Sequence, residues 1–275
     1  MNKVGRAGVM LRFFLLWSCL AYITVGGLMG CASKGADAEI KSDLLTDSDE
    51  PESRKRARIR LELAVGYYSN GQTTIALDEL KQSINADPTL FDAYNLRGLI
   101  YSRLNNVPLA EESFRRALVI NPKAGGVQHN YALLLCQQSR FPEAMQFFAA
   151  ALANPGYGER AKTWMAQGGC ELSNGKKAEA ESSFLRSYEL DAGNPITGYN
   201  LALLLYQRQE YVRSQFYVRR INNSELANAE SLWLGIKVER RMGNTDAVAQ
   251  LGTQLNRRFP QSRESSAFER GAFDE

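Results

Sequence analysis

The sequence predicts an all-α fold, a right-handed superhelix built from six copies of one helical hairpin. Large and small apolar residues recur at a period of 34 residues, and Pro follows several of the copies. Turn-forming pairs that contain Gly, such as Asn70-Gly71 and Asn174-Gly175, separate the two helices of a copy. A fixed period of this length is typical of stacked helical repeats, so we expect repeats across residues 51–262.

The repeat is best defined by residues 91–124. Its large, small and helix-breaking positions match the tetratricopeptide (TPR) pattern of W-x2-L-G-x2-Y, then A-x3-F, then P, over 34 residues. Arg97 occupies the position at which Leu is usual. The matching residues are Tyr94, Gly98, Tyr101, Ala110, Phe114, Ala117 and Pro122.

Five further copies surround this unit. Residues 57–90 precede it and residues 125–158 follow it, while more degenerate copies begin near Ala161, Pro195 and Asn228. The small residues let the first (A) and second (B) helix of each copy approach closely, and Pro ends the B helix. One hairpin cannot bury its apolar face alone, so neighbouring copies are expected to stack. Residues 263–275 fall outside the repeats and form either a capping helix or a frayed tail.

The N-terminus has the composition of an export signal. Residues 1–12 carry three basic residues, and residues 13–30 are uncharged and apolar. A transmembrane anchor is the alternative, but a run of 18 residues is at the short end for a membrane span. Leu28-Met29-Gly30-Cys31 resembles the bacterial lipobox. That resemblance implies removal of residues 1–30 and attachment of diacylglycerol and an acyl chain such as palmitate to Cys31.

The residues after Cys31 predict where the anchored chain resides. Ala32 and Ser33 follow it, without the Asp that retains enteric lipoproteins in the inner membrane. The resemblance therefore implies the outer membrane, with the chain facing the periplasm. Residues 31–50 are rich in Ser, Ala, Gly and Asp and are expected to form a flexible tether.

Charge argues against nucleic-acid binding. The formal net charge is +3, and Lys3, Arg6 and Arg12 of the export signal account for all of it. The rest of the chain is neutral, which disfavours a nucleic-acid binder that relies on net charge. The one basic cluster, residues 54–60, could contact anionic lipid or an acidic partner. We favour a solvated helix, because acidic residues lie just upstream at residues 47–52.

The residues needed for an active site are missing from the sequence. His129 is the only histidine, and it stands seven residues before Cys136, about 10 Å along a helix and too far for a Cys-His pair. No glycine-rich phosphate loop is present. We therefore predict no enzyme activity, cofactor, metal site or small-molecule substrate, and we interpret His129 as a polar residue lining a groove.

Two cysteines remain in the exported part of the chain. Cys19 leaves with the signal and Cys31 is lipidated, so Cys136 and Cys170 form one pair in an oxidising compartment. They lie on the A helices of adjacent copies, which run side by side. We predict a Cys136–Cys170 disulfide that joins repeat three to repeat four; two buried thiols are the alternative.

The A helices are expected to line a concave groove for a protein partner. Asn130 and Asn200 each stand two residues before the small residue of their helix, where Asn binds the ligand backbone in peptide-binding repeat proteins. The alternative is that they are merely exposed polar positions. The candidate groove residues are Asn95, Leu99, His129, Asn130, Leu133, Tyr199, Asn200 and Leu203.

Almost the whole exported chain resembles the type IV pilus biogenesis lipoproteins of the PilF/PilW family. The resemblance rests on the lipobox, the acidic tether and the segments at residues 52–58, 63–68, 203–206 and 232–237. It implies a pilotin, a protein that helps the outer-membrane secretin reach the membrane and form its ring, or that stabilises pili, in support of twitching motility. A general envelope scaffold that recruits peptidoglycan enzymes or outer-membrane assembly factors is the second hypothesis.

Overall fold

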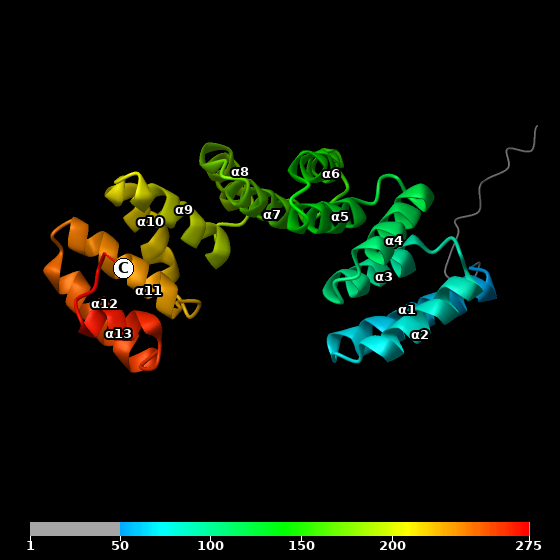
Figure 1. Ribbon diagram of the computed structural model, residues 1–275, viewed down its shortest axis with the longest axis horizontal. Helices are drawn as coiled ribbons and strands as arrows, with labels where there is room; N and C mark the ends of the chain where they lie inside the picture. Colours follow the sequence, from blue (N-terminus) through cyan, green and yellow to red (C-terminus); the bar gives the residue numbers. More distant parts are fainter. Residues whose placement is uncertain (1–49, 275) are drawn as a thin grey trace, which may run out of the picture. The chain divides into compact units, whose positions relative to one another are not determined.

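The computed structural model describes residues 50–274. Within this range the secondary structure consists of thirteen α-helices and no strands, which confirms the predicted all-α TPR superhelix (Figure 1). The helices are α1 (Glu52–Ser69), α2 (Thr73–Ala86), α3 (Phe91–Arg103), α4 (Val107–Ile120), α5 (Gly125–Gln137), α6 (Phe141–Ala153), α7 (Arg160–Ser173), α8 (Lys177–Leu190), α9 (Pro195–Gln207), α10 (Tyr211–Asn222), α11 (Ala229–Arg241), α12 (Thr245–Arg258) and α13 (Arg263–Glu269).

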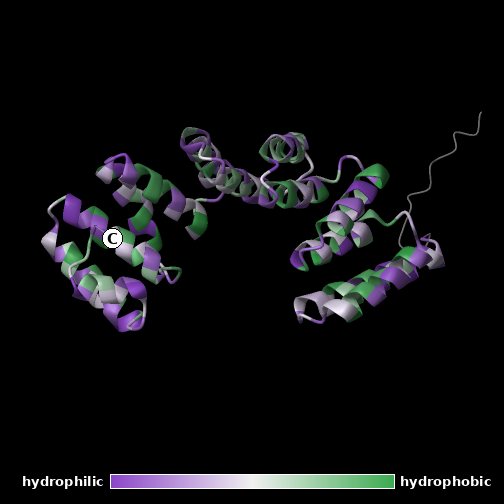
Figure 2. Cartoon of the chain, in the orientation of Figure 1, coloured by the Kyte–Doolittle hydropathy of each residue, from purple (hydrophilic) through white to green (hydrophobic). Residues whose placement is uncertain are grey.

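The first twelve helices form six hairpins. Each odd-numbered helix is an A helix and makes its most extensive contacts with the even-numbered B helix that follows it. Each B helix then contacts the A helix of the next hairpin, and A helices also contact one another along α1, α3, α5 and α7. Hydrophobic and hydrophilic residues are both present in every hairpin (Figure 2), and the stacking of hairpins removes much of the hydrophobic surface from water.

Small residues set the distance between the two helices of a hairpin. A Cβ atom placed on Gly98 of α3 would lie 2.6 Å from the ring of Phe114 on α4. Gly168 of α7 stands in the same relation to Phe184 of α8, at 2.8 Å. Both rings are almost completely buried. The glycines are therefore required for close packing against a large B-helix ring rather than for a special backbone conformation.

Every A–B turn places one residue in the left-handed region of backbone space. Gly71, Gly175 and Gly243 occupy this position with φ between 73° and 76°. In hairpin one, the N–H of the next residue donates to the carbonyl of Tyr67, as in a Schellman helix end. The other three hairpins use the same turn without Gly, and their left-handed residues are Asn105, Ser139 and Gln209.

The chain beyond the sixth hairpin folds back onto it. The short helix α13 contacts both α11 and α12. The ring of Phe268 lies directly over Gly252 of α12, where a Cβ atom would come within 2.0 Å of it. Phe273 stacks on Trp233 of α11 with ring centroids 5.4 Å apart. The C-terminal segment thus covers apolar surface that a seventh hairpin would otherwise cover.

A buried carboxylate connects the last two hairpins. Glu239 of α11 has a side chain only 2% exposed. Its oxygens accept hydrogen bonds from Arg219 Nε at 2.7 Å, Gln215 Nε2 at 2.9 Å and Asn244 Nδ2 at 2.6 Å. Burial opposes ionisation, but the hydrogen bonds outweigh it and lower the pKa of Glu239 below its ordinary value of 4.5.

We expect Glu239→Gln to lower the free energy of unfolding by about 2 kcal/mol near neutral pH, because a charge-assisted bond to Arg219 is lost. A carboxyl with a depressed pKa stabilises the folded state above its unfolded pKa, and the contribution disappears as pH falls through the folded pKa. The difference between variant and wild type should therefore shrink in acid. Urea unfolding at neutral and acidic pH measures it.

Glu189→Gln is the matched control for this experiment, because Glu189 is exposed and its ion pair is with Arg186, an exposed residue of the same helix. It should change stability by less than about 0.5 kcal/mol at either pH. A Glu239→Gln protein as stable as this control would contradict the proposed contribution of the network.

Candidate partner-binding surface

The A helices present a row of side chains along the repeats. Consecutive A helices contact each other at α1–α3, α3–α5, α5–α7 and α9–α11. We call the exposed side of this row the A-helix face and define it by seven half-exposed residues. These are Asn95 and Leu99 on α3, Asn130 and Leu133 on α5, and Tyr199, Asn200 and Leu203 on α9.

The apolar members of the A-helix face are anchored in the core beneath it. Leu99 and Leu133 pack against the cluster that contains the buried ring of Phe114. Tyr199 and Leu203 pack against a second cluster, formed with residues of α10 and α11. The face therefore offers part of each apolar side chain to a ligand, on a support that is held by packing.

Asn130 and Asn200 lie on this face in two different settings. Asn130 Nδ2 donates to Asn95 Oδ1 at 3.1 Å, which joins the A helices of repeats two and three. Asn200 Nδ2 donates to the carbonyl of Ile196 at 2.8 Å, within its own helix. A peptide backbone that takes either amide nitrogen must replace one of these bonds.

The predicted position of His129 in the groove is wrong. Its side chain is 2% exposed and points between α5 and α7. The Nδ1 atom lies 2.8 Å from Thr163 Oγ1, and the Tyr157 hydroxyl is 3.1 Å from the same oxygen. Burial lowers the pKa of His129 from 6.5 to about 4, so the ring is neutral at physiological pH. His129 therefore contributes to the contact between two repeats.

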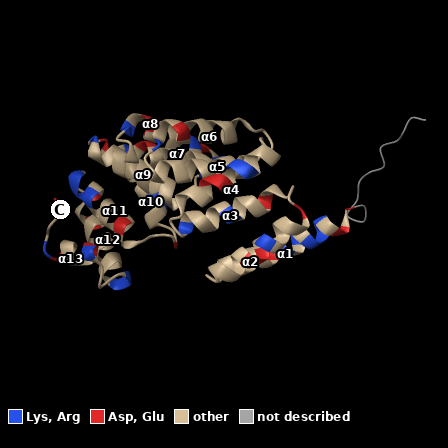
Figure 3. Cartoon of the chain, turned by 45° about the vertical axis from the view of Figure 1, so that its right-hand side comes forward, with Lys and Arg blue, Asp and Glu red and all other residues tan. Residues whose placement is uncertain are grey.

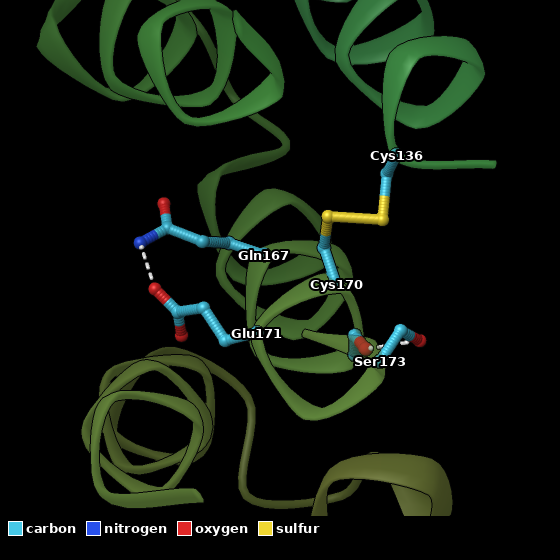
Figure 4. Close-up of a disulfide and its surroundings, with 6 residues drawn as sticks. Cys136, Gln167, Cys170, Glu171 and Ser173 are labelled. Atoms are coloured by element: carbon cyan, nitrogen blue, oxygen red, sulfur yellow. Dashed lines mark hydrogen bonds between the residues drawn. A yellow bond between two sulfur atoms is a disulfide. The ribbon is translucent and has the colours of Figure 1, made fainter. Parts of the chain in front are cut away.

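Cys136 of α5 and Cys170 of α7 are joined by a disulfide between repeats three and four (Figure 4). Their Cα atoms are 5.8 Å apart, within the range that an unstrained disulfide spans. Close to the bond, Gln167 Nε2 donates to a carboxylate oxygen of Glu171 at 2.9 Å. The disulfide and the His129–Thr163 contact both hold α5 against α7.

The basic cluster at the start of α1 is largely neutralised by acidic residues. Arg58 pairs with Glu50 at 2.9 Å, and Arg60 pairs with Glu79 at 2.9 Å. Arg54 lies 3.4 Å from a carboxylate oxygen of Asp87. Figure 3 shows basic and acidic residues interleaved over this part of the chain. The arrangement favours the solvated, ion-paired helix over a dedicated anion-binding surface.

The sixth A helix, α11, also carries a residue at the spacing that defines the A-helix face. Trp233 of α11 stands two residues before Gly235, in the same relation as Asn130 to Ala132 and Asn200 to Ala202. The signal was therefore present in the spacing. Trp233 is only 8% exposed, because the ring of Phe273 in the C-terminal segment stacks on it. The spacing in the sequence does not reveal this contact.

The remaining sequence predictions concern other kinds of site. Over residues 50–274, no group of three His, Cys, Asp or Glu side chains is arranged to hold a metal ion. No helix in the same range has both the length and the hydropathy needed to cross a membrane. Cys31, the export signal and the tether up to residue 49 lie outside the described residues.

Comparison with known proteins identifies relatives of the chain. The tetratricopeptide repeat family matches residues 61–125 and 130–195. Over 252 residues the chain is 30% identical to the type IV pilus assembly protein PilF of Pseudomonas aeruginosa. The aligned region covers 92% of this chain and 97% of PilF.

Two solved structures share both fold and sequence with it. The structure of Pseudomonas aeruginosa PilF has a TM-score of 0.72 at 29% identity and covers 80% of this chain and 100% of PilF. The structure of PilW, described as a widely conserved type IV pilus biogenesis factor, has a TM-score of 0.67 at 28% identity. The match covers 77% of this chain and 97% of PilW. The expected resemblance is confirmed, and the chain belongs to the PilF/PilW family of tetratricopeptide-repeat proteins.

Proposed function

We propose that this protein is a non-catalytic scaffold for type IV pilus biogenesis, anchored by lipid to the periplasmic side of the outer membrane. The observation that carries the proposal is the 30% identity to a pilus assembly protein over 97% of that protein's length, because the likeness also extends over 92% of this chain. The supports for anchoring are the lipobox at residues 28–31 and the apolar run before it.

In this proposal the lipid on Cys31 holds the repeats near the membrane, and residues 32–49 let them reach a partner. The A-helix face then binds an extended or helical segment of an assembly protein, for which the outer-membrane secretin is our candidate. Asn130 and Asn200 supply polar contacts to the segment's backbone, while Leu99, Leu133 and Leu203 supply apolar contacts.

The proposal is tested by deleting the gene and analysing unheated outer-membrane extracts on a gel for the high-mass secretin ring. We expect the ring and surface pili to be lost in the deletion strain. A wild-type copy should restore both, and a Cys31→Ala copy should restore them only partly, because its product is not held at the membrane. Normal rings and pili in the deletion strain would reject the proposal. Altered cell shape with normal pili would favour the general envelope scaffold.

The same strain tests the A-helix face. An Asn130→Ala, Asn200→Ala copy removes two polar contacts and should reduce ring formation several-fold, since each hydrogen bond contributes about 1 kcal/mol. Gln146→Ala is the matched control, because Gln146 is an exposed amide on the B helix α6. Equal activity of the two copies, at equal protein levels, would show that these Asn residues do not contact the partner.

A further inference from the structure

A pocket of about 280 Å³ lies between α9, α11 and the C-terminal segment. Tyr206 of α9 and Phe273 of the C-terminal segment supply its aromatic side chains. Tyr206 packs on the same apolar cluster as Tyr199 and Leu203, so the pocket continues the A-helix face toward the end of the repeats. The charged residues that line it are Lys237, Arg240, Arg241 and Asp274.

This pocket, which we call the basic–aromatic pocket, has three cations and one carboxylate. Lys237 Nζ lies 5.5 Å from the ring of Trp233 and 5.9 Å from that of Tyr206. No carboxylate oxygen within residues 50–274 forms an ion pair of 4 Å or less with it. Burial lowers the pKa of Lys237, and the charge of Asp274 offsets this only in part. A half-buried ammonium with aromatic neighbours and no ion pair is stabilised by a ligand that brings an anion.

The C-terminal segment shows what chemistry fits the pocket. Phe273 stacks on Trp233 at 5.4 Å, and the Arg240 guanidinium lies 3.8 Å from the centre of the Phe273 ring. The neighbouring Asp274 places a carboxylate oxygen 3.2 Å from Arg241 Nη2. An aromatic ring followed by a carboxylate thus satisfies both the rings and the cations. The Asp274 side chain is 87% exposed, so its ion pair is weak and replaceable.

We propose that the basic–aromatic pocket binds a partner segment in which an aromatic residue adjoins an acidic residue, and that Phe273 and Asp274 form one wall of the pocket until this segment takes their place. The proposal rests on the proposed function, because it takes the A-helix face as the partner surface. It adds the chemistry of the partner: an acidic peptide with an aromatic anchor, attracted by the excess of basic side chains and more weakly bound as salt rises.

The test measures fluorescence anisotropy of a labelled peptide, Gly-Ala-Phe-Asp-Glu, against the full chain in detergent. This is the sequence of residues 271–275. A Phe273→Ala, Asp274→Asn protein no longer competes for its own pocket and should bind the peptide about tenfold more tightly than wild type. A neutral peptide, Gly-Ala-Phe-Asn-Gln, should bind this opened protein about tenfold more weakly than the acidic one. An acidic peptide with Ala in place of Phe should also bind the opened protein about tenfold more weakly than Gly-Ala-Phe-Asp-Glu.

Lys237→Met, added to the opened protein, keeps the apolar stem and removes the charge. It should reduce the preference for the acidic peptide severalfold, because Arg240 and Arg241 remain, whereas Arg186→Gln, which removes an exposed cation of α8, should leave it unchanged. Circular dichroism and thermal unfolding show whether each variant folds. If the Lys237→Met protein does not fold, Arg240→Gln is used in its place. Equal affinity for the acidic and neutral peptides, or no binding to the opened protein, would overturn the proposal.

Failure of the pocket can be distinguished from failure of the proposed function. Peptide binding is measured without pili, and pilus assembly is measured in the deletion strain. Absent peptide binding together with pili that depend on the gene would reject the basic–aromatic pocket and leave the proposed function in place. Peptide binding by the protein, together with normal pili in the deletion strain, would reject the proposed function and leave the basic–aromatic pocket in place.

Discussion

Phe114→Ala is expected to lower the free energy of unfolding by about 3–5 kcal/mol. Phe114 is fully buried on α4, with its ring against Gly98 of α3. The same ring stacks on Tyr131 of α5, with centroids 5.8 Å apart. One side chain therefore closes its own hairpin and joins it to the next. Truncation leaves a cavity in a packed core, and the surrounding residues relax into it only partly.

Urea unfolding followed by circular dichroism measures this loss. Val119→Ala is the matched control, because Val119 is on the same helix but 70% exposed, and it should change stability by less than about 0.5 kcal/mol. We also expect the Phe114→Ala protein to lose cooperativity between its first two hairpins and the rest, since stacked repeats depend on interfaces between neighbours. Equal stability of the two variants would contradict the central position of Phe114 in the core.

Replacing both Cys136 and Cys170 by Ala is expected to lower the free energy of unfolding of the oxidised protein by about 3–4 kcal/mol. The two residues are 34 positions apart, so their bond restricts a long loop of the unfolded chain. Ala is the suitable replacement, because Cys170 is 2% exposed and a Ser hydroxyl would be buried there.

Reductant separates the bond from the side chains. Wild-type protein in dithiothreitol should fall to the stability of the double variant, and the variant itself should not respond. Counting free thiols in denatured, unreduced protein is an independent test. We expect no free thiol at Cys136 or Cys170, and two free thiols would reject the disulfide. Because this bond joins repeats three and four, its loss should also weaken any partner bound across α5 and α7.

The repeat fold could be predicted from sequence because its signal is local and recurs. Gly98 and Phe114 have counterparts in Gly168 and Phe184 two copies later, and the spacing alone places them on facing helices. The turns were predicted less completely. Gly71 and Gly175 mark left-handed positions, but Ser139 is held at the same position by the helix end around it, against its own preference.

The candidate surface was predicted in part. Periodicity put Asn95, Asn130, Asn200 and His129 on one face; the structure places the three Asn residues at half-exposed positions of A helices and buries His129. Adjacent positions on a helix differ by about 100° in direction, so one residue separates the groove from the interface between repeats. Whether His129 or the adjacent Asn130 faces Thr163 depends on how α7 packs against α5.

The sequence by itself determined the repeat, its number of copies and the pairing of A with B helices, because these depend on contacts within about one period. Only the tertiary structure decided that His129 is buried, that Glu239 collects three hydrogen bonds, and that Phe273 covers Trp233. These features join residues from different hairpins or from the C-terminal segment. Their geometry is set by the packing of one hairpin on the next, for which the sequence carries no periodic signal.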